Sequence, residues 1–256
     1  MIDAVVLAGG VDKGDIAAEL GVVHRPLLEV GGQPIIARVL AALRGAAEIG
    51  RVVLVAPPPV QAAVSEEAVD ARVVAGDSYI DNMAGGVEAT SPGSDHLLII
   101  TGDLPLITAA AVDDFVRQSL ASGAVLCYAI IPKESSERRF PGGRRTYVRL
   151  REGTFTGGNA IVVTRDFVEL HRHLLDRLFA VRKNPLKMAS LLGVRFVFWL
   201  LTRRLTLPHT EARAGAILGA RAAAIVSDYP ELGFDVDKLD DLYLSRRVAD
   251  SSDSRL

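Results

Sequence analysis

The chain has 256 residues, of which 49% are hydrophobic and 23% charged, and its formal net charge is −2. This composition excludes a disordered chain, and the near balance of charge provides no global field that would attract nucleic acid. The single cysteine, Cys127, excludes an internal disulfide, favours a cytoplasmic compartment and is expected in the core. The mean hydropathy is +0.26, rather high for a soluble enzyme, so the location of the apolar residues matters.

Short apolar runs alternate with helical patterns through the first half of the chain. The runs at 4–7, 52–55, 72–75 and 97–100 predict buried strands, and the segments 34–43, 60–69, 79–88 and 109–120 have helical apolar spacing. This alternation predicts right-handed βαβ units in a three-layer α/β/α sandwich with a mostly parallel, doubly wound sheet. The ligand of such a sheet binds beyond the carboxyl ends of the strands.

The second half of the chain has a less regular pattern. Strands are predicted at 124–131, 146–151, 160–163 and 221–226, and helices at 166–179, 183–204, 207–218 and 238–248. The charged stretch 132–145 contains Gly and Pro and predicts a surface loop. No linker separates two domains, so we expect one domain over 1–249 with a helical insertion at about 165–218, followed by a polar, frayed tail at 250–256.

Two glycine-containing motifs lie near the start of the chain. The first strand runs into Leu7-Ala8-Gly9-Gly10, and a long loop leads on to Arg25-Pro-Leu-Leu-x-x-Gly-Gly-x-Pro-Ile-Ile. Glycines directly after a first parallel strand let backbone N–H groups approach a phosphate closely. The spacing matches neither the G-x-G-x-x-G fingerprint nor a Walker A motif, and the Gly-Gly pair taken alone also fits a structural turn.

Carboxylates follow the strand at 97–100 and precede the last predicted helix. Asp103 lies at the carboxyl end of its strand, where it suits Mg²⁺ carried by phosphates, although it also fits a turn or a helix cap. Asp235 and Asp237 alternate on one face of an extended segment. Asp237 also fits the N-cap of the helix that follows.

Taken together, the two glycine-containing motifs resemble the signature of nucleotidyltransferases with a glycosyltransferase-A-like Rossmann fold. The molybdenum cofactor guanylyltransferase-like branch is the most similar. The resemblance implies that Leu7, Ala8, Gly9 and Gly10 bind the nucleotide, and that Lys13 and Arg25 act as catalytic cations. The family has Arg and Lys at these two positions, so the charge is kept while the donor geometry differs. The carboxylates Asp12 and Asp15 in the same loop depart from the pattern.

The resemblance also assigns the metal and the two substrates. It implies that Asp103 and Asp237 hold Mg²⁺, with Asp235 as a weaker candidate. Asn82 is a candidate for base or phosphate contact, in a segment where Ser78 also fits a helix cap. Asn159 is the candidate for the acceptor side. The implied reaction couples an NTP to a phosphorylated small-molecule acceptor and releases pyrophosphate.

Two other functions remain compatible with the sequence. One is a glycosyltransferase that uses a nucleotide-sugar, and the other is a catalytically inactive nucleotide-binding or membrane-surface protein. The segment 182–204 holds six basic and no acidic residues, and its apolar stretch is too short to span a bilayer. It fits docking on an anionic membrane, or a lipid-linked phosphate lying against Phe196 and Trp199. It equally fits a helix that covers the sheet or makes a homodimer contact.

Overall fold

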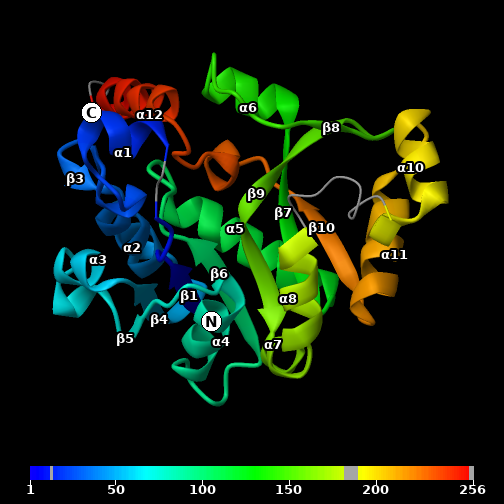
Figure 1. The fold of residues 1–256 in the computed structure, drawn as a ribbon, viewed down its shortest axis with the longest axis horizontal. Helices are drawn as coiled ribbons and strands as arrows, with labels where there is room; N and C mark the ends of the chain where they lie inside the picture. The colour runs from blue at the N-terminus through cyan, green and yellow to red at the C-terminus, as the bar shows by residue number, and fades with distance from the viewer. Residues whose placement is uncertain (12–13, 182–189, 254–256) are drawn as a thin grey trace.

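The protein is described by a computed structural model that covers residues 1–11, 14–181 and 190–253. A mixed sheet with the strand order β10-β7-β9-β6-β1-β4-β5 forms its centre, with β8 paired to β9 and a separate β2–β3 pair (Figure 1). The strands are β1 (Ile2–Leu7), β2 (Glu29–Val30), β3 (Gln33–Pro34), β4 (Ile49–Ala56), β5 (Ala71–Val74), β6 (His96–Thr101), β7 (Leu126–Pro132), β8 (Val148–Arg149), β9 (Thr154–Thr164) and β10 (Ala222–Val226). The α-helices are α1 (Asp15–Leu20), α2 (Ile35–Gly45), α3 (Pro58–Ala62), α4 (Tyr79–Glu88), α5 (Ala109–Ser122), α6 (Lys133–Arg139), α7 (Arg165–Leu170), α8 (Arg172–Val181), α10 (Val194–Leu201), α11 (Leu207–Leu218) and α12 (Leu239–Asp253), and the 3-10 helices are η1 (Arg25–Leu27), η2 (Glu66–Ala68) and η3 (Pro230–Gly233).

The sheet is mostly parallel, as the sequence predicts. Strand β1 pairs in parallel with β4 and β6, β4 with β5, and β7 with β10. Strand β9 is antiparallel to its neighbours β6, β7 and β8. All six residues of β1 are buried, because helices cover both faces of the sheet.

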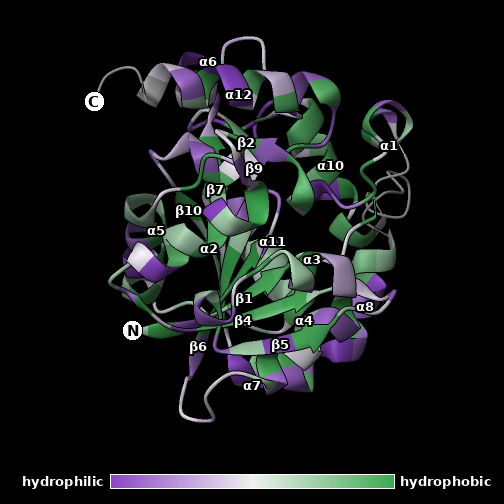
Figure 2. Ribbon diagram, turned by 90° about the vertical axis from the view of Figure 1, so that its left-hand side faces the viewer, coloured by the Kyte–Doolittle hydropathy of each residue, from purple (hydrophilic) through white to green (hydrophobic). Residues whose placement is uncertain are grey.

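Alternation along β1 divides the interior into two cores. Ala4 and Val6 pack into a core shared with α2 and α5, whereas Val5 and Leu7 pack into a second core shared with α4 and α7. Figure 2 shows the hydrophobic strands between helices that carry hydrophilic residues. These two cores make the three layers, and the predicted fold class is confirmed. Cys127 is fully buried, as expected.

Three predicted segments in the first part of the chain differ from the structure. The stretch 132–145 is not simply a loop, because it contains α6. The helix predicted at 60–69 is divided into α3 and η2, since the Arg72 guanidinium donates to the carbonyl groups of Gln61, Val64 and Ser65. The loop predicted between Gly10 and Arg25 includes the short helix α1.

Differences also occur in the second part of the chain. The helix predicted at 166–179 breaks at His171 into α7 and α8. Of the helix predicted at 183–204, residues 183–189 lie outside the described residues, and α10 starts after Gly193, whose φ is 87°. Residues 250–253 of the predicted polar tail continue α12, and residues 254–256 lie outside the described residues.

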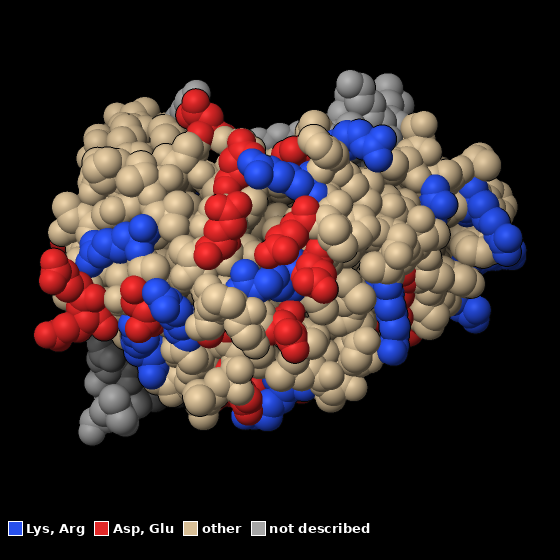
Figure 3. Space-filling view, turned by 90° about the horizontal axis from the view of Figure 1, so that it is seen from below, with Lys and Arg blue, Asp and Glu red and all other residues tan. Residues whose placement is uncertain are grey.

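The structure also shows the lengths of the apolar helices and the distribution of charge on one face. Across the described residues, no helix is both long and apolar enough to cross a membrane. On the face seen in Figure 3, Lys and Arg side chains are interspersed with Asp and Glu. That face therefore carries no extended field of a single sign.

Candidate functional site

A cavity of about 520 Å³ opens at the carboxyl ends of β1 and β6, a volume typical of small-molecule sites. The sequence-predicted residues that line it are Leu7 to Gly10, Arg25, Asn82, Asp103 and Asn159. Asp237 does not line the cavity, but its carboxylate accepts a hydrogen bond from Arg25, which does. Lys13 lies outside the described residues.

The two glycines of the first turn have different surroundings. A Cβ atom on Gly9 would lie 2.9 Å from the Cβ of Ala75 and 3.3 Å from Nδ2 of Asn82, so only glycine fits there. Among the described residues, a Cβ atom on Gly10 would meet only the Arg25 guanidinium, at 3.8 Å. Gly9 therefore sets the path of the backbone, and Gly10 leaves room over the cavity.

Helix α4 begins at the cavity with a side-chain cap. The Ser78 hydroxyl accepts a hydrogen bond from the backbone N–H of Asp81 at 3.1 Å, as expected for an N-cap. The Asn82 amide accepts from the backbone N–H of Gly76 at 2.7 Å and donates to its carbonyl at 2.9 Å. Asn82 thus fixes the turn before α4, and its contact with a nucleotide remains a prediction.

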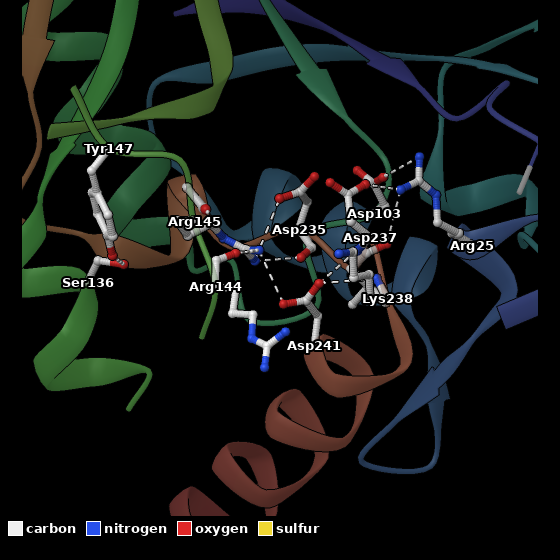
Figure 4. A network of polar contacts seen from close by, with 12 residues as sticks. Arg25, Asp103, Ser136, Arg144, Arg145, Tyr147, Asp235, Asp237, Lys238 and Asp241 are labelled. Atoms are coloured by element: carbon white, nitrogen blue, oxygen red, sulfur yellow. Dashed lines mark hydrogen bonds and ion pairs between the residues drawn. The ribbon is translucent and has the colours of Figure 1, made fainter. Parts of the chain in front are cut away.

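Arg25 contacts two carboxylates that are far apart in the sequence (Figure 4). Its Nη2 atom is 3.6 Å from Oδ2 of Asp103, and its Nη1 atom donates to Oδ1 of Asp237 and, at 3.2 Å, to the carbonyl of Val236. Asp103 follows β6, whereas Asp237 precedes α12. The fold thus brings the three predicted polar residues together, although 212 positions separate Arg25 from Asp237.

Asp103 is the more deeply buried of these two carboxylates. Burial raises the pKa of Asp103, and the negative charge of Asp237 adds to this shift against the opposing charge of Arg25. Among the described residues, Oδ1 of Asp103 and the hydroxyl of Thr101 are buried and neither makes a hydrogen bond of good geometry, although the Thr101 hydroxyl is close enough to oppose the rise in the pKa of Asp103. A buried carboxylate oxygen without a partner is a favourable position for a cation.

The described side chains alone do not form a complete metal site. Within residues 1–11, 14–181 and 190–253, no group of three or more His, Cys, Asp or Glu side chains is placed to hold a metal ion. A cation at Asp103 and Asp237 would therefore take further oxygen ligands from phosphate groups and water, as Mg²⁺ commonly does.

A third carboxylate, Asp235, is held near this pair by an arginine that the sequence did not single out. Burial first, and then the charges of Asp103 and Asp237, raise the pKa of Asp235 to about 6. Arg145 donates to the carbonyl groups of Asp235 and Gly233, at 2.7 and 3.1 Å, and its guanidinium is 3.7 Å from the Asp235 carboxylate. No local pattern marks Arg145, because its partners follow some 90 residues later.

Asp241, rather than Asp237, caps helix α12. Oδ2 of Asp241 accepts from the backbone N–H groups of Asp237 and Lys238, at 3.2 and 3.1 Å, and the helix begins at Leu239. The N-cap interpretation of Asp237 was therefore wrong, because a carboxylate in the first turn reaches back to these N–H groups. The Asp237 carboxylate is instead directed to Arg25.

Aromatic residues that the sequence analysis did not assign also line the cavity. Tyr79 of α4 and Phe179 of α8 stack with their ring centroids 4.3 Å apart. Tyr128 of β7 lines the same cavity, and burial, followed by the charge of Asp235, raises the pKa of its phenol. Only the position of Tyr79 directly after the cap residue Ser78 could have indicated its place.

Comparisons with known proteins agree with this arrangement. Residues 4–221 match the family model of the MobA-like NTP transferase domain. The structure is similar to that of a hypothetical transferase from Thermus thermophilus, with 37% identity, coverage of 94% of this chain and 99% of that one, and a TM-score of 0.82. Among curated proteins there is no match.

Two more distant solved structures share the fold. One is CMP:2-keto-3-deoxy-manno-octonic acid synthetase complexed with CTP, with a TM-score of 0.62, 14% identity and 100% coverage of both chains. The other is 2-C-methyl-D-erythritol 4-phosphate cytidylyltransferase, also from Thermus thermophilus, with a TM-score of 0.58, 15% identity, and 98% and 100% coverage. At these identities the similarity concerns the fold alone.

Proposed function

The chain belongs to the family of MobA-like NTP transferase domains and is a nucleotidyltransferase, and on this premise we propose that it couples an NTP to a phosphorylated small-molecule acceptor in a Mg²⁺-dependent reaction. The observation that carries the proposal is the convergence of Arg25, Asp103 and Asp237 beside a cavity walled by the Gly9–Gly10 turn. The contact between Arg25 and Asp237 also supports a single domain over 1–249. The single, buried Cys127 supports a cytoplasmic location.

The nucleotide is expected to lie along the cavity. Its phosphates lie over the turn at Gly9 and Gly10, where backbone N–H groups approach them, and Lys13 and Arg25 neutralise their charge. Its base lies toward Tyr79 and Phe179, because aromatic rings offer flat apolar surfaces for stacking. Asn82 fixes the turn before α4, between these two regions.

Asp103 and Asp237 are the residues that would hold the metal. The unpartnered Oδ1 of Asp103 fits this role, since a cation would satisfy a buried oxygen that has no hydrogen bond. The bound cation would neutralise the triphosphate and the charge that develops on departing pyrophosphate. Arg25, whose guanidinium contacts both carboxylates, would pair with the phosphates of the nucleotide.

The reaction needs no protein nucleophile. An oxygen of the acceptor phosphate attacks the α-phosphorus in line, the bond from that phosphorus to the bridging oxygen breaks, and pyrophosphate leaves with the electron pair. The chain positions the two substrates and neutralises charge, which is the main contribution of proteins to such transfers. Asn159 on β9 faces the cavity and orients the acceptor.

The test compares Asp103→Asn and Asp237→Asn with the exposed Asp240→Asn in thermal unfolding. At a concentration about 100-fold above Kd, Mg²⁺ with the preferred NTP should raise the Tm of the parent chain and of Asp240→Asn by about 5–10 °C. Both site variants should lose the Mg²⁺-dependent part of this shift. If they respond to Mg²⁺ and each of the four NTPs as the parent chain does, the metal assignment is wrong.

A further inference from the structure

A second cavity, of about 430 Å³, is lined by residues of the sheet and of helices α10 and α11. Figure 1 shows where these two helices lie relative to β10. Strands β7, β9 and β10 form its floor, and side chains such as Ile130, Phe155, Phe196 and Leu200 make its wall almost entirely apolar. Glu211 is a charged exception, but its carboxylate accepts a hydrogen bond from the backbone N–H of Ala224 at 2.8 Å. Its volume is in the range of ligand pockets, about 300–1,000 Å³.

The apolar cavity adjoins the nucleotide cavity at Tyr128, which lines both. Along β9, residues 155–157 line the apolar cavity and residues 158–161 line the nucleotide cavity. A Cβ atom on Gly157 would lie 2.3 Å from the hydroxyl oxygen of Tyr128, so the phenol lies directly over this glycine. Tyr128 therefore lies between the apolar cavity and the part of the nucleotide cavity that Asn159 lines.

Exposed arginines are sequence neighbours of residues that line the apolar cavity. Arg149, Arg151 and Arg204 each stand next in sequence to a residue that lines it, and all three are exposed. A fourth, Arg195, lies over the Trp199 ring at 4.3 Å. Glu152 is the acidic residue among them, and it accepts from the backbone N–H of Leu207 at 3.1 Å. These exposed arginines offer positive charge to an anionic group, while the interior of the cavity complements hydrocarbon.

Helix α10 is apolar on its outer side as well. Its inner side chains, Phe196 and Leu200, line the cavity, whereas Val194, Phe198 and Leu201 are 86%, 55% and 77% exposed. An exposed apolar surface combined with exposed arginines is typical of proteins that take a lipid from an anionic interface.

We propose that the acceptor is an amphipathic phosphate monoester whose hydrocarbon chain occupies the apolar cavity and whose phosphate reaches past Tyr128 to the nucleotide site. This inference rests on the proposed function, since it names the acceptor class. A phosphate oxygen of the lipid forms the new bond to the α-phosphorus of the NTP, and pyrophosphate leaves. The product is a lipid-linked nucleoside diphosphate. A hydrocarbon chain suits the cavity because it brings no polar group that would need a hydrogen bond there.

The binding test uses Trp199, the only tryptophan in the chain. Its ring stacks on His209 with the centroids 4.3 Å apart, and it packs against the cluster of Leu150, Phe155 and Leu205 beside the cavity. The full chain is titrated with butyl, octyl and dodecyl phosphate below their micelle concentrations. The tryptophan emission should change, and affinity should rise by up to about fourfold for each further buried methylene. Inorganic phosphate, as a control, should produce no such change.

A matched pair of variants on α11 tests whether the hydrocarbon chain of the ligand lies within the apolar cavity. Ala214 lines the cavity, whereas Ala212, two positions earlier, is exposed. Ala214→Phe should weaken dodecyl phosphate binding at least tenfold, and Ala212→Phe should leave it unchanged. The Tm shift with NTP and Mg²⁺ should persist in both variants, which shows that each has folded.

The outcomes separate this inference from the proposed function. Equal affinity for butyl and dodecyl phosphate would overturn the inference, and so would binding confined to anionic phospholipid vesicles and insensitive to Ala214→Phe. Pyrophosphate release with butyl phosphate as efficient as that with dodecyl phosphate would refute the inference and leave the proposed function intact. Chain-length-dependent binding without pyrophosphate release from any of the four NTPs would refute the proposed function itself.

Discussion

Asp235 shows how closely the carboxylates of the site are packed. Its side chain is flanked by Arg145 on one side and faces the charges of Asp103 and Asp237 on the other (Figure 4). Its pKa of about 6 means that the buried environment disfavours the ionised form more than Arg145 favours it. The folded chain is therefore under electrostatic strain at neutral pH, which a divalent cation would relieve.

This strain predicts a pH-dependent effect of Asp235→Asn on stability. Below a pH of about 3.8 the carboxyl group is protonated in both the folded and unfolded states, and above about 6 it is ionised in both. Between these values the folded state binds more protons, so the free energy of unfolding of the parent chain falls as pH rises. Asp235→Asn removes this fall. Urea unfolding without divalent cations should show the variant gaining stability relative to the parent between pH 4 and pH 7, and an unchanged difference would contradict the raised pKa.

At the scale of elements, helix α4 is held against the sheet at one particular glycine. A Cβ atom on Gly86 would lie 2.3 Å from Cγ1 of Val5 and 2.8 Å from Cγ2 of Val55, whereas one on Gly85 would lie 3.5 Å from Cγ1 of Val73. The close approach at Gly86 sets the depth at which α4 packs. It thereby helps to place the Ser78 cap at the edge of the nucleotide cavity.

The two glycines predict opposite effects of the same substitution. Gly86→Ala overpacks the core and should lower the free energy of unfolding by about 1–3 kcal/mol. Gly85→Ala makes an ordinary contact in a helix interior and should raise it by up to about 1 kcal/mol. Urea unfolding of the two variants beside the parent chain measures both changes. Effects of the same sign would show that α4 does not pack at this depth.

At the scale of the whole molecule, Arg145 ties the middle of the chain to its C-terminal segment. Its side chain is 9% exposed and donates to Asp241 at 3.2 Å, in addition to the carbonyl groups of Gly233 and Asp235. Its guanidinium also lies over the Phe234 ring at 4.7 Å. These contacts hold the segment that carries Asp237 to the rest of the site.

Arg145→Gln, with Arg144→Gln as its matched control, tests how much these contacts of Arg145 stabilise the fold. Loss of Arg145 leaves the buried carboxylates of Asp235 and Asp241 without their cation, and should cost about 3–5 kcal/mol. Arg144 is exposed, so its loss should change stability by no more than about 0.5 kcal/mol. Chemical unfolding measures both changes in the free energy of unfolding. A loss below about 1 kcal/mol for Arg145→Gln would contradict the stabilising role of its contacts.

Local signals account for what the sequence predicted well. The bounds of α4 and α11 match the prediction, since Ser78 and Thr206 cap their first turns and Gly219 ends α11. The resemblance, which rested on the two glycine-containing motifs, is confirmed by the family match. The fold class is confirmed because each β-rich run carries its own pattern. The direction of β9, the role of Arg145 and the apolar cavity were not predicted. All three depend on pairings between distant residues that no local window contains.

The contact between Arg25 and Asp237 has a consequence for how the protein is made. The two residues are 212 positions apart, and ribosomes add about 5–20 residues per second, so roughly 10–40 s separate their synthesis. Throughout this interval the nascent chain already carries β1, the glycine turn and Arg25, but not the second carboxylate. The emerging chain therefore cannot assemble the Arg25–Asp103–Asp237 cluster, and that cluster forms only once the C-terminal segment has left the ribosome.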